Sequence, residues 1–284
     1  MHVIVTGGSS GIGLAIAKLY ATRGAWVSLL ARDTGRLEEA RAEIAMLPGV
    51  DSAFIRTASV DVASAEQTNE AVRLCEAFFG PCDILVASAG IVEPRTFDAM
   101  SASVFDEQIS VNLLGTANAV RAVYKGMKSR RGGRIMMISS GAALIGIFGY
   151  TAYCASKSAL AGFAEALSAE ADVWGVQISI CFPPDTMTPQ YAREIALRPR
   201  EAEILMGAVK PWSAEEVAAR IVRGMDRGRQ KIHFGFLLTA LAYFGPLIKP
   251  LLLWWFSRKA RKIFGDEAHS GLADTGKQSF DRDK

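Results

Sequence analysis

The residues best suited to chemistry lie in one stretch, from Ser139 to Lys157. Tyr153 and Lys157 are four positions apart, so they share one face if this part of the chain is helical. A phenol held beside an ammonium group is a plausible proton donor, because the positive charge favours the phenolate. Ser140 lies at the mouth of an apolar run, 134–138, that is typical of a buried strand. The stretch therefore predicts acid–base chemistry where a strand meets a helix.

A glycine loop near the N-terminus predicts a dinucleotide site. The apolar strand Val3–Val5 leads into the loop, and a periodic apolar helix follows it. Glycines allow close approach of the backbone to a phosphate, and a helix N-terminus offers free amides. A tight turn is the alternative, but the position between strand and helix favours the cofactor. The candidate loop residues are Gly7, Ser9, Ser10, Gly11, Ile12 and Gly13.

Two arginines indicate which dinucleotide is bound. Arg32 ends the second predicted strand, about 20 residues beyond the loop, and Arg36 lies one helical turn further on. In such folds a basic residue here binds the 2′-phosphate of NADP(H), whereas an acid binds the 2′-hydroxyl of NAD(H). Asp33 is interpreted as the cap of the following helix. The alternative is that both arginines are solvated surface charges.

Other candidate binding residues follow the ends of later strands. Asp61 could accept a hydrogen bond from the adenine amino group, and the small residues near Gly90 fit close approach to a ribose. Thr186 and Thr188 could bind a carboxamide or a phosphate, although helix capping is an equally ordinary role. The full set is Asp61, Val62, Ala89, Gly90, Pro183, Thr186 and Thr188.

Asn112 is a polar residue on an apolar stretch of a helix predicted over 103–129. A buried amide must find hydrogen-bond partners. It is either a structural hydrogen bonder or the anchor of a water in a proton relay.

Strands alternate with helices along most of the chain, which predicts an α/β fold, a doubly wound parallel sheet (Rossmann fold). A chain of 284 residues, half of them hydrophobic, can bury one large core. We expect a reductase domain over 1–232, an apolar and basic segment over 233–264 and a polar, disordered tail over 265–284. Ligands bind at the carboxyl ends of parallel strands, where the candidate residues gather.

The overall charge and the cysteines exclude several classes of partner. The net charge is only +3, without a long basic field, so nucleic acid is not expected as a partner. The four cysteines are scattered without metal-ligand spacing and are interpreted as reduced core thiols, and no metal site is expected. A strand begins at His2 with no signal peptide before it, so folding in the cytoplasm is expected.

Residues 234–256 are almost wholly apolar and are followed by a basic cluster at 258–262. The segment is long enough to span a membrane, but Pro246 and Pro250 argue against an unbroken helix, and Lys249 would lie deep inside the bilayer. We expect two short helices in the membrane interface, with 234–262 contacting the membrane surface. A dimer contact or a core-covering segment is the alternative.

Taken together, these motifs make residues 3–230 resemble the short-chain dehydrogenase/reductase superfamily. The motifs are Thr6-Gly7-x3-Gly11-Ile12-Gly13, Asp61, Ala89-Gly90, Asn112, Ser140 and Tyr153-x3-Lys157. The resemblance implies that Tyr153 donates the proton, that Lys157 lowers its pKa and binds the nicotinamide ribose, and that Ser140 polarises the carbonyl. It also implies a relay water on Asn112 and a homo-oligomer. Ser139 is the alternative to Ser140.

Within the superfamily, three stretches resemble the 3-ketodihydrosphingosine reductases: 80–83, 146–153 and 183–189. The resemblance implies NADPH-dependent reduction of a long-chain sphingoid ketone on the cytoplasmic side of a membrane. Eukaryotic members carry an N-terminal membrane segment, so a bacterial enzyme at the inner membrane is expected, or the endoplasmic reticulum for a eukaryotic one. Ala87-Ser88 and Pro183-Pro184 depart from the common superfamily pattern of two asparagines and Pro-Gly.

Two other functions compete with this one. The same chemistry would serve a hydroxysteroid, a retinoid or a β-ketoacyl substrate. A non-catalytic NADP(H)-sensing membrane scaffold is a different class, but it would have no use for the proton donor Tyr153.

Overall fold

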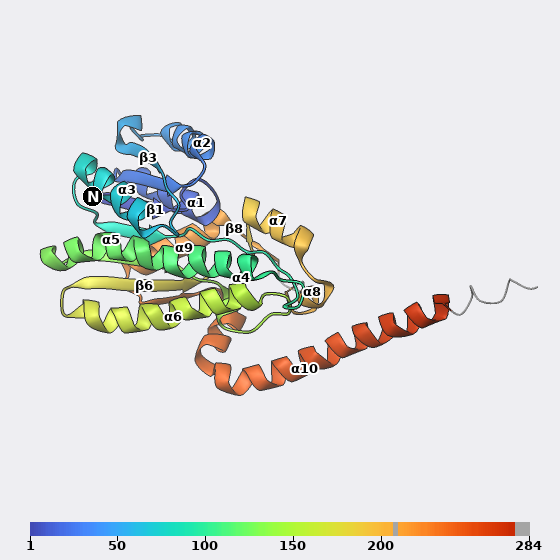
Figure 1. Cartoon of the computed structure of the whole chain (residues 1–284). Helices are drawn as coiled ribbons and strands as arrows, with labels where there is room; N and C mark the ends of the chain where they lie inside the picture. Colours follow the sequence, from blue (N-terminus) through green and yellow to red (C-terminus); the bar gives the residue numbers. More distant parts are fainter. Residues whose placement is uncertain (207–209, 276–284) are drawn as a thin grey trace, which may run out of the picture.

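The computed structural model describes residues 1–206 and 210–275, and its centre is a parallel seven-stranded sheet (Figure 1). The strand order is β3-β2-β1-β4-β5-β6-β9, as expected for a doubly wound fold. Most positions in the central strands are buried, which explains why the sequences of these strands are continuous apolar runs. The strands are β1 (His2–Thr6), β2 (Trp26–Ala31), β3 (Ile55–Ser59), β4 (Ile84–Ala87), β5 (Gly133–Ile138), β6 (Val176–Phe182) and β9 (Lys231–His233).

Helices cover both faces of the sheet. Side chains alternate along each strand, so Val3 and Val5 enter one core and Ile4 enters the other. The first core is completed by α1 (Gly11–Ala21), α2 (Thr34–Ala45) and α9 (Ala214–Asp226). The second is completed by α3 (Ala65–Phe79), α5 (Gly115–Arg130) and α6 (Thr151–Asp172). This arrangement confirms the predicted fold class.

The helix predicted over 103–129 is interrupted at the site. It consists of α4 (Ala102–Ile109), a π-helical turn over Ser110–Leu114 and α5. The turn contains Asn112, whose side chain is fully buried. A π-helical turn inside an α-helix is rare and frequently marks a functional position.

Three short features lie between the longer strands and helices. Residues Ser52–Phe54, directly before β3, form a 3-10 turn in which the Asp51 carboxylate accepts the Ala53 amide at 2.8 Å. Two helices, α7 (Pro189–Leu197) and α8 (Arg200–Met206), follow the loop after β6. Pro199 separates them, since the residue before a proline disfavours helical geometry. A short parallel ladder, β7 (Thr186–Met187) with β8 (Trp212–Ser213), was not predicted.

The last described helix, α10 (Gly235–Thr275), projects away from the domain (Figure 1). It bends once, at Phe244, directly before Gly245-Pro246, and then runs on through Pro250. In place of the two short helices that we expected, the segment forms a short helix before Phe244 and a long one after it. Helical geometry also continues into the predicted disordered tail, because extending an existing helix costs little. Residues 276–284 of that tail lie outside the described residues.

Candidate active site

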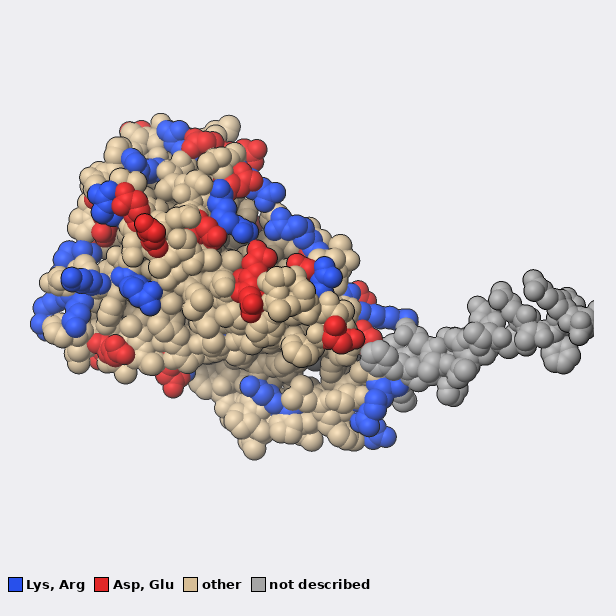
Figure 2. All heavy atoms as spheres, in the orientation of Figure 1, with Lys and Arg blue, Asp and Glu red and all other residues tan. Residues whose placement is uncertain are grey.

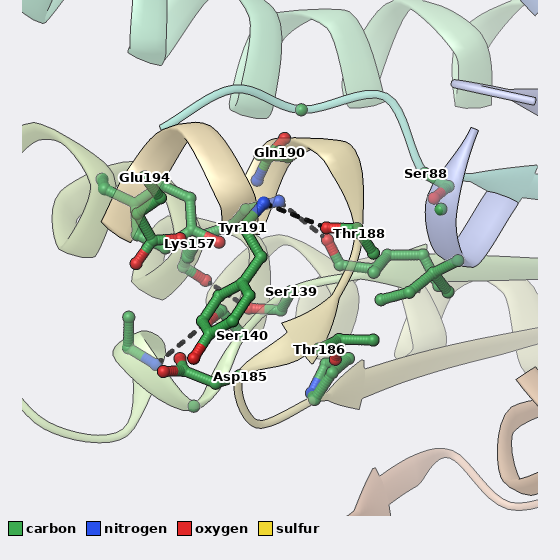
Figure 3. Close-up of a pocket in the computed structure, with 18 of the residues that line it drawn as sticks. Ser88, Ser139, Ser140, Lys157, Asp185, Thr186, Thr188, Gln190, Tyr191 and Glu194 are labelled. Carbon is green, nitrogen blue, oxygen red and sulfur yellow. Dashed lines mark hydrogen bonds between the residues drawn. The ribbon is translucent and has the colours of Figure 1, made fainter. Parts of the chain in front are cut away.

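A cavity of about 720 Å³ lies at the carboxyl ends of the strands. The glycine loop, the ends of β2, β4 and β5, helix α7 and the start of α10 all contribute to its wall. Of the predicted catalytic residues, Ser140, Tyr153 and Lys157 line it. Ser140 and Lys157 are labelled in Figure 3. The sheet therefore gathers residues that are far apart in the sequence into one site.

Tyr153 and Lys157 come from the first turns of α6, and the Lys157 Nζ lies 5.7 Å from the centroid of the tyrosine ring. Burial lowers the pKa of Lys157 to about 8. Burial, with the charge of Glu194 as the next cause, raises the pKa of Tyr153, while a hydrogen bond with Ser140 lowers it. The lowering of the Tyr153 pKa by Lys157 therefore stays a prediction, because burial is the largest cause and raises that pKa.

The two candidate serines have different surroundings. The Ser139 side chain is buried, and its hydroxyl donates a hydrogen bond of 2.9 Å to the main-chain carbonyl of Lys157. Ser140 is only partly buried, its hydroxyl accepts the Ala142 amide at 3.1 Å, and it lies close enough to the Tyr153 hydroxyl to lower the pKa of the phenol. Of the two, only Ser140 meets the tyrosine through its side chain.

The Asn112 side chain is engaged on both of its ends. Its Oδ1 accepts the Ile91 amide at 2.8 Å, and its Nδ2 donates to the Ile91 carbonyl at 3.0 Å and to Ser156 Oγ at 2.9 Å. Its own carbonyl accepts the Thr116 hydroxyl at 2.8 Å. Asn112 therefore joins the loop after β4 to α6, as a structural hydrogen bonder would. The water that Asn112 would hold in a proton relay stays a prediction.

The backbone around the glycine loop fits a dinucleotide. Gly7 has a φ of +66°, and a Cβ there would lie 2.8 Å from the backbone of Ala89. A Cβ on Gly13 would collide with the Gly7 carbonyl, and one on Gly90 would lie 3.2 Å from Asn112 Oδ1 and 3.3 Å from Lys157 Nζ. Gly13 does not line the cavity and instead lets α1 pack closely on the loop; the other predicted loop residues line it. The cradle at the start of α1 is thus open to a phosphate.

Both predicted arginines line the cavity near the end of β2. Arg32 Nη1 lies 3.7 Å from the Glu107 carboxylate, and Arg36 Nε lies 3.6 Å from Asp33. All four side chains are more than half exposed, so these ion pairs are weak and leave the guanidinium groups available. Asp33 caps α2 by accepting the Arg36 amide at 3.0 Å, as predicted.

The residues predicted at the other strand ends also line the cavity: Asp61, Val62, Ala89, Gly90, Pro183, Thr186 and Thr188. Asp61 accepts the Ala63 amide through Oδ1 at 3.0 Å. The Thr186 hydroxyl donates to the Pro184 carbonyl at 2.8 Å, and Thr188 caps α7 by accepting the Tyr191 amide at 3.1 Å. Both threonines therefore have structural partners already.

Four polar side chains at the cavity were not predicted as a group; three of them, Tyr150, Asp185 and Glu194, line its wall. Tyr150, Asp185, Glu194 and Arg198, here named the α7 cluster, are joined by hydrogen bonds and ion pairs. Glu194 and Arg198 are four residues apart, a spacing that pairs side chains on one face of a helix, and that spacing was the available signal. In the described ranges no group of three or more His, Cys, Asp or Glu side chains could hold a metal ion.

Comparison with known proteins agrees with this geometry. Residues 1–196 match the short chain dehydrogenase family. The "3-dehydrosphinganine reductase" of Danio rerio is 38% identical over 244 residues, which cover 84% of this chain and 74% of the relative. The "3-ketodihydrosphingosine reductase" of Bos taurus is 37% identical with the same coverage, and "3-dehydrosphinganine reductase TSC10B" of Arabidopsis thaliana is 38% identical, covering 84% of this chain and 72% of the relative.

Solved structures share the architecture. Levodione reductase superposes with a TM-score of 0.75 at 25% identity, covering 82% of this chain and 95% of that one. An alcohol dehydrogenase from the archaeon Thermococcus sibiricus, complexed with 5-hydroxy-NADP, gives a TM-score of 0.70 at 25% identity with the same coverage. The chain therefore belongs to the short-chain dehydrogenase/reductase family of nicotinamide-dependent oxidoreductases, and within it the chain groups with the 3-dehydrosphinganine reductases.

Proposed function

We propose that this protein reduces 3-ketodihydrosphingosine to dihydrosphingosine with NADPH. The observation that carries the proposal is the contact of Tyr153 with Ser140 beside the buried Lys157, in a cavity whose wall continues onto an apolar helix. A hydroxyl pair fits the oxygen of a ketone, and an apolar wall fits a long alkyl chain. The names of the relatives at 37–38% identity support this substrate.

Each catalytic residue has a distinct task in this proposal. The nicotinamide cofactor, when bound, supplies a hydride to the carbonyl carbon. Ser140 and Tyr153 hold the carbonyl oxygen, and Tyr153 transfers its phenolic proton to that oxygen as negative charge develops there. Lys157 is fixed by its hydrogen bond to Ile138 and supplies positive charge close to the phenolate that remains. The ketone thereby gains one hydride and one proton and becomes a secondary alcohol.

The cofactor preference is proposed from charge. Arg32 and Arg36 line the cavity at the end of β2, where a 2′-phosphate would lie in this fold, and their carboxylate partners hold them only weakly. A phosphate dianion would bind two guanidinium groups in preference to exposed carboxylates that water already solvates. The preference for NADPH over NADH therefore rests on these two side chains.

Helix α10 supports delivery of a lipid from a membrane. Leu238, Leu252 and Trp255 line the cavity, and a Cβ on Gly141, next to Ser140, would lie 3.0 Å from Leu238 Cδ2. Residues Gly235–Arg261 are long and apolar enough to cross a bilayer, with a mean hydropathy of 1.7 and 11% of the apolar window buried against the protein. The helix therefore connects the catalytic end of the cavity with a large exposed apolar surface.

We favour a position of α10 in the membrane interface over a spanning one. Phe244 bends the helix, and Lys249 lies within its apolar part. The guanidinium of Arg258 lies 4.9 Å from the Trp254 ring centroid, and Lys259 Nζ lies 4.2 Å from that of Trp255. Aromatic rings paired with cations suit the headgroup region, and basic residues favour the cytoplasmic face. Figure 2 shows basic but no acidic side chains on this part of α10.

A substrate panel tests the proposed function against the same chemistry on other ketones. NADPH oxidation is followed with 3-ketodihydrosphingosine, a 3-ketosteroid, retinal and a β-ketoacyl thioester, each presented in detergent micelles. We expect kcat/KM for the sphingoid ketone to exceed the others at least tenfold. Turnover of a steroid, retinoid or acyl ketone without turnover of the sphingoid ketone would contradict the substrate. Cofactor binding without turnover of any ketone would favour a non-catalytic scaffold.

A further inference from the structure

The α7 cluster is a buried charged group on the wall of the cavity. Arg198 Nη2 donates to Glu194 Oε1 at 2.7 Å and to Asp185 Oδ2 at 2.9 Å, and Arg198 Nε donates to the Tyr150 hydroxyl at 3.1 Å. The Tyr150 hydroxyl donates in turn to Glu194 Oε1 at 2.7 Å. The side chains of Arg198, Glu194 and Asp185 are only 5%, 12% and 18% exposed.

The charges of this cluster do not balance. Two carboxylates share one guanidinium group, which leaves a formal charge of −1 when both are ionised. Burial raises the pKa of both Glu194 and Asp185, so the excess negative charge is unfavourable there. A cation entering from the cavity would relieve it.

Each carboxylate keeps one oxygen for a ligand. Glu194 Oε2 and Asp185 Oδ1 accept no hydrogen bond from any residue that the structure describes, whereas their other oxygens are both engaged. No buried side-chain nitrogen or oxygen in the described part of the chain lacks a partner, so these two oxygens retain access to solvent. Both residues line the cavity, and they therefore present acceptor atoms to it.

The cluster lies next to the proposed proton donor. Glu194 and Asp185 are both close enough to Tyr153 for their charges to raise its pKa, and the Tyr150 and Tyr153 rings meet edge to face at 6.3 Å. Figure 3 shows Glu194 on the helix above the part of the cavity that contains Ser140, Asp185 and Lys157. A group bound to the free carboxylate oxygens would therefore be adjacent to a ketone held by Tyr153.

A sphingoid ketone carries such a group, because its ammonium lies on the carbon next to the carbonyl. We propose that Glu194 and Asp185 bind the substrate ammonium and thereby select a 2-amino ketone over ketones without an amine. This inference rests on the proposed function and adds the basis of its specificity. A charge-assisted hydrogen bond to a buried carboxylate is strong, and a substrate without the amine would leave the carboxylate uncompensated.

The same contact would assist catalysis. The charge of Glu194 opposes ionisation of Tyr153, so an ammonium that neutralises Glu194 makes the phenol a better proton donor. A ketone without the amine would lack this assistance. We therefore expect the amine to raise kcat as well as to lower KM.

The test compares two substrates in two proteins. 3-Ketodihydrosphingosine and its analogue with hydrogen in place of the 2-amino group are assayed with the full chain and with Glu194→Gln. The glutamine can still accept from Tyr150 and Arg198, so the cluster keeps its shape. We expect the wild type to prefer the amino ketone by about 10- to 100-fold in kcat/KM. Glu194→Gln should lower that preference about tenfold or more, because kcat/KM falls for the amino ketone and stays equal or rises for the analogue, which no longer meets an uncompensated carboxylate beside Tyr153. Glu203→Gln, an exposed acid on α8, is the matched control and should preserve the preference.

The outcomes separate the inference from the proposed function. Failure of the wild type to reduce either sphingoid compound would contradict the proposed function. Two results would overturn the ammonium site and assign the cluster to holding α7 in place. One is equal kcat/KM of the wild type for the amino ketone and its analogue; the other is an equal loss of kcat/KM for the two compounds in Glu194→Gln. If Glu194→Gln does not fold, Asp185→Asn is assayed in its place, again as the ratio of kcat/KM for the amino ketone to kcat/KM for the analogue. A ratio equal to that of the wild type would overturn the proposal.

Discussion

The Lys157 ammonium donates a hydrogen bond of 3.0 Å to the carbonyl oxygen of Ile138, the last residue of β5. This bond joins helix α6 to the central sheet and holds a charged group in the protein interior, where only 5% of the residue is exposed. The position suits catalysis but is costly for folding, because a buried ammonium has lost its water.

Replacing Lys157 with Met should therefore stabilise the protein while abolishing its activity. In the folded protein the pKa of Lys157 is about 8, so below pH 8 the lysine is charged in the folded and in the unfolded chain. There, burial of the charged ammonium lowers the stability of the folded protein by about 3 kcal/mol. Between pH 8 and 10.5 the unfolded chain binds more protons, so wild-type stability rises with pH. We expect urea denaturation to show Lys157→Met about 1–2 kcal/mol more stable at pH 7, after the lost hydrogen bond to Ile138, and the difference to shrink by pH 10. A less stable variant at pH 7, or a difference independent of pH, would contradict this account.

The two neighbouring serines should separate catalysis from stability. Ser140→Ala removes a hydroxyl in contact with Tyr153 and should lower kcat about 10²- to 10³-fold. Ser139→Ala removes an additional donor from the Lys157 main-chain carbonyl, which also accepts an amide within helix α6, and should cost about 0.5–1.5 kcal/mol of stability, with kcat within tenfold of the wild type. Steady-state kinetics and thermal melting of both variants check this. The reverse pattern would make Ser139 the catalytic serine.

The fold could be predicted from the sequence because it depends on local patterns. Continuous apolar strands alternated with periodic helices, and the glycine loop lay between the first strand and helix. The carboxyl ends of parallel strands meet at one edge, so the sequence alone predicted that Gly90, Ser140 and Pro183 lie at one site, and all three line the cavity. Asp33 and Thr188 could likewise be interpreted as helix caps.

What the sequence did not predict depends on tertiary contacts. Ser139 and Ser140 both follow the end of β5, and which of the two hydroxyls lies beside Tyr153 depends on the fold of the chain after the strand. The α7 cluster combines a helix, a loop and Tyr150, and only the folded chain brings Asp185 to Arg198. The π-helical turn at Asn112 has no simple sequence pattern. The bend of α10 at Phe244 was anticipated only through the prolines that follow it.

The two arginines at the end of β2 should determine cofactor preference. Arg32→Ala and Arg36→Ala should each raise KM for NADPH about 10- to 100-fold, from the loss of a charged hydrogen bond, and leave KM for NADH unchanged. Arg41→Ala is the control, because Arg41 lies on helix α2 with Arg36 but pairs with Glu38 and does not line the cavity. Equal effects on both cofactors would assign the arginines to the solvated surface.

Apolar residues of α10 that do not line the cavity should hold the protein on lipid. Leu247 and Leu251 are 75% and 71% exposed and share one helix face. The double variant Leu247→Gln/Leu251→Gln should float with anionic vesicles at least tenfold less than the wild type, because it loses apolar area for insertion. Turnover of a short-chain, soluble amino ketone should not change.

Phe97→Gln is the matched control for vesicle binding, since Phe97 is 70% exposed and lies far along the chain from α10. It should float like the wild type. Equal flotation of the α10 variant and the wild type would show that this face serves another contact, such as a second copy of the chain.

The most direct test of the proposed function is NADPH oxidation with 3-ketodihydrosphingosine by the wild type and by Tyr153→Phe. The substitution removes only the phenolic hydroxyl, which is the proposed proton donor and the partner of Ser140. We predict turnover by the wild type and a loss of at least about 10²-fold in kcat for the variant, with unchanged thermal stability. Turnover by Tyr153→Phe at the wild-type rate would contradict the account.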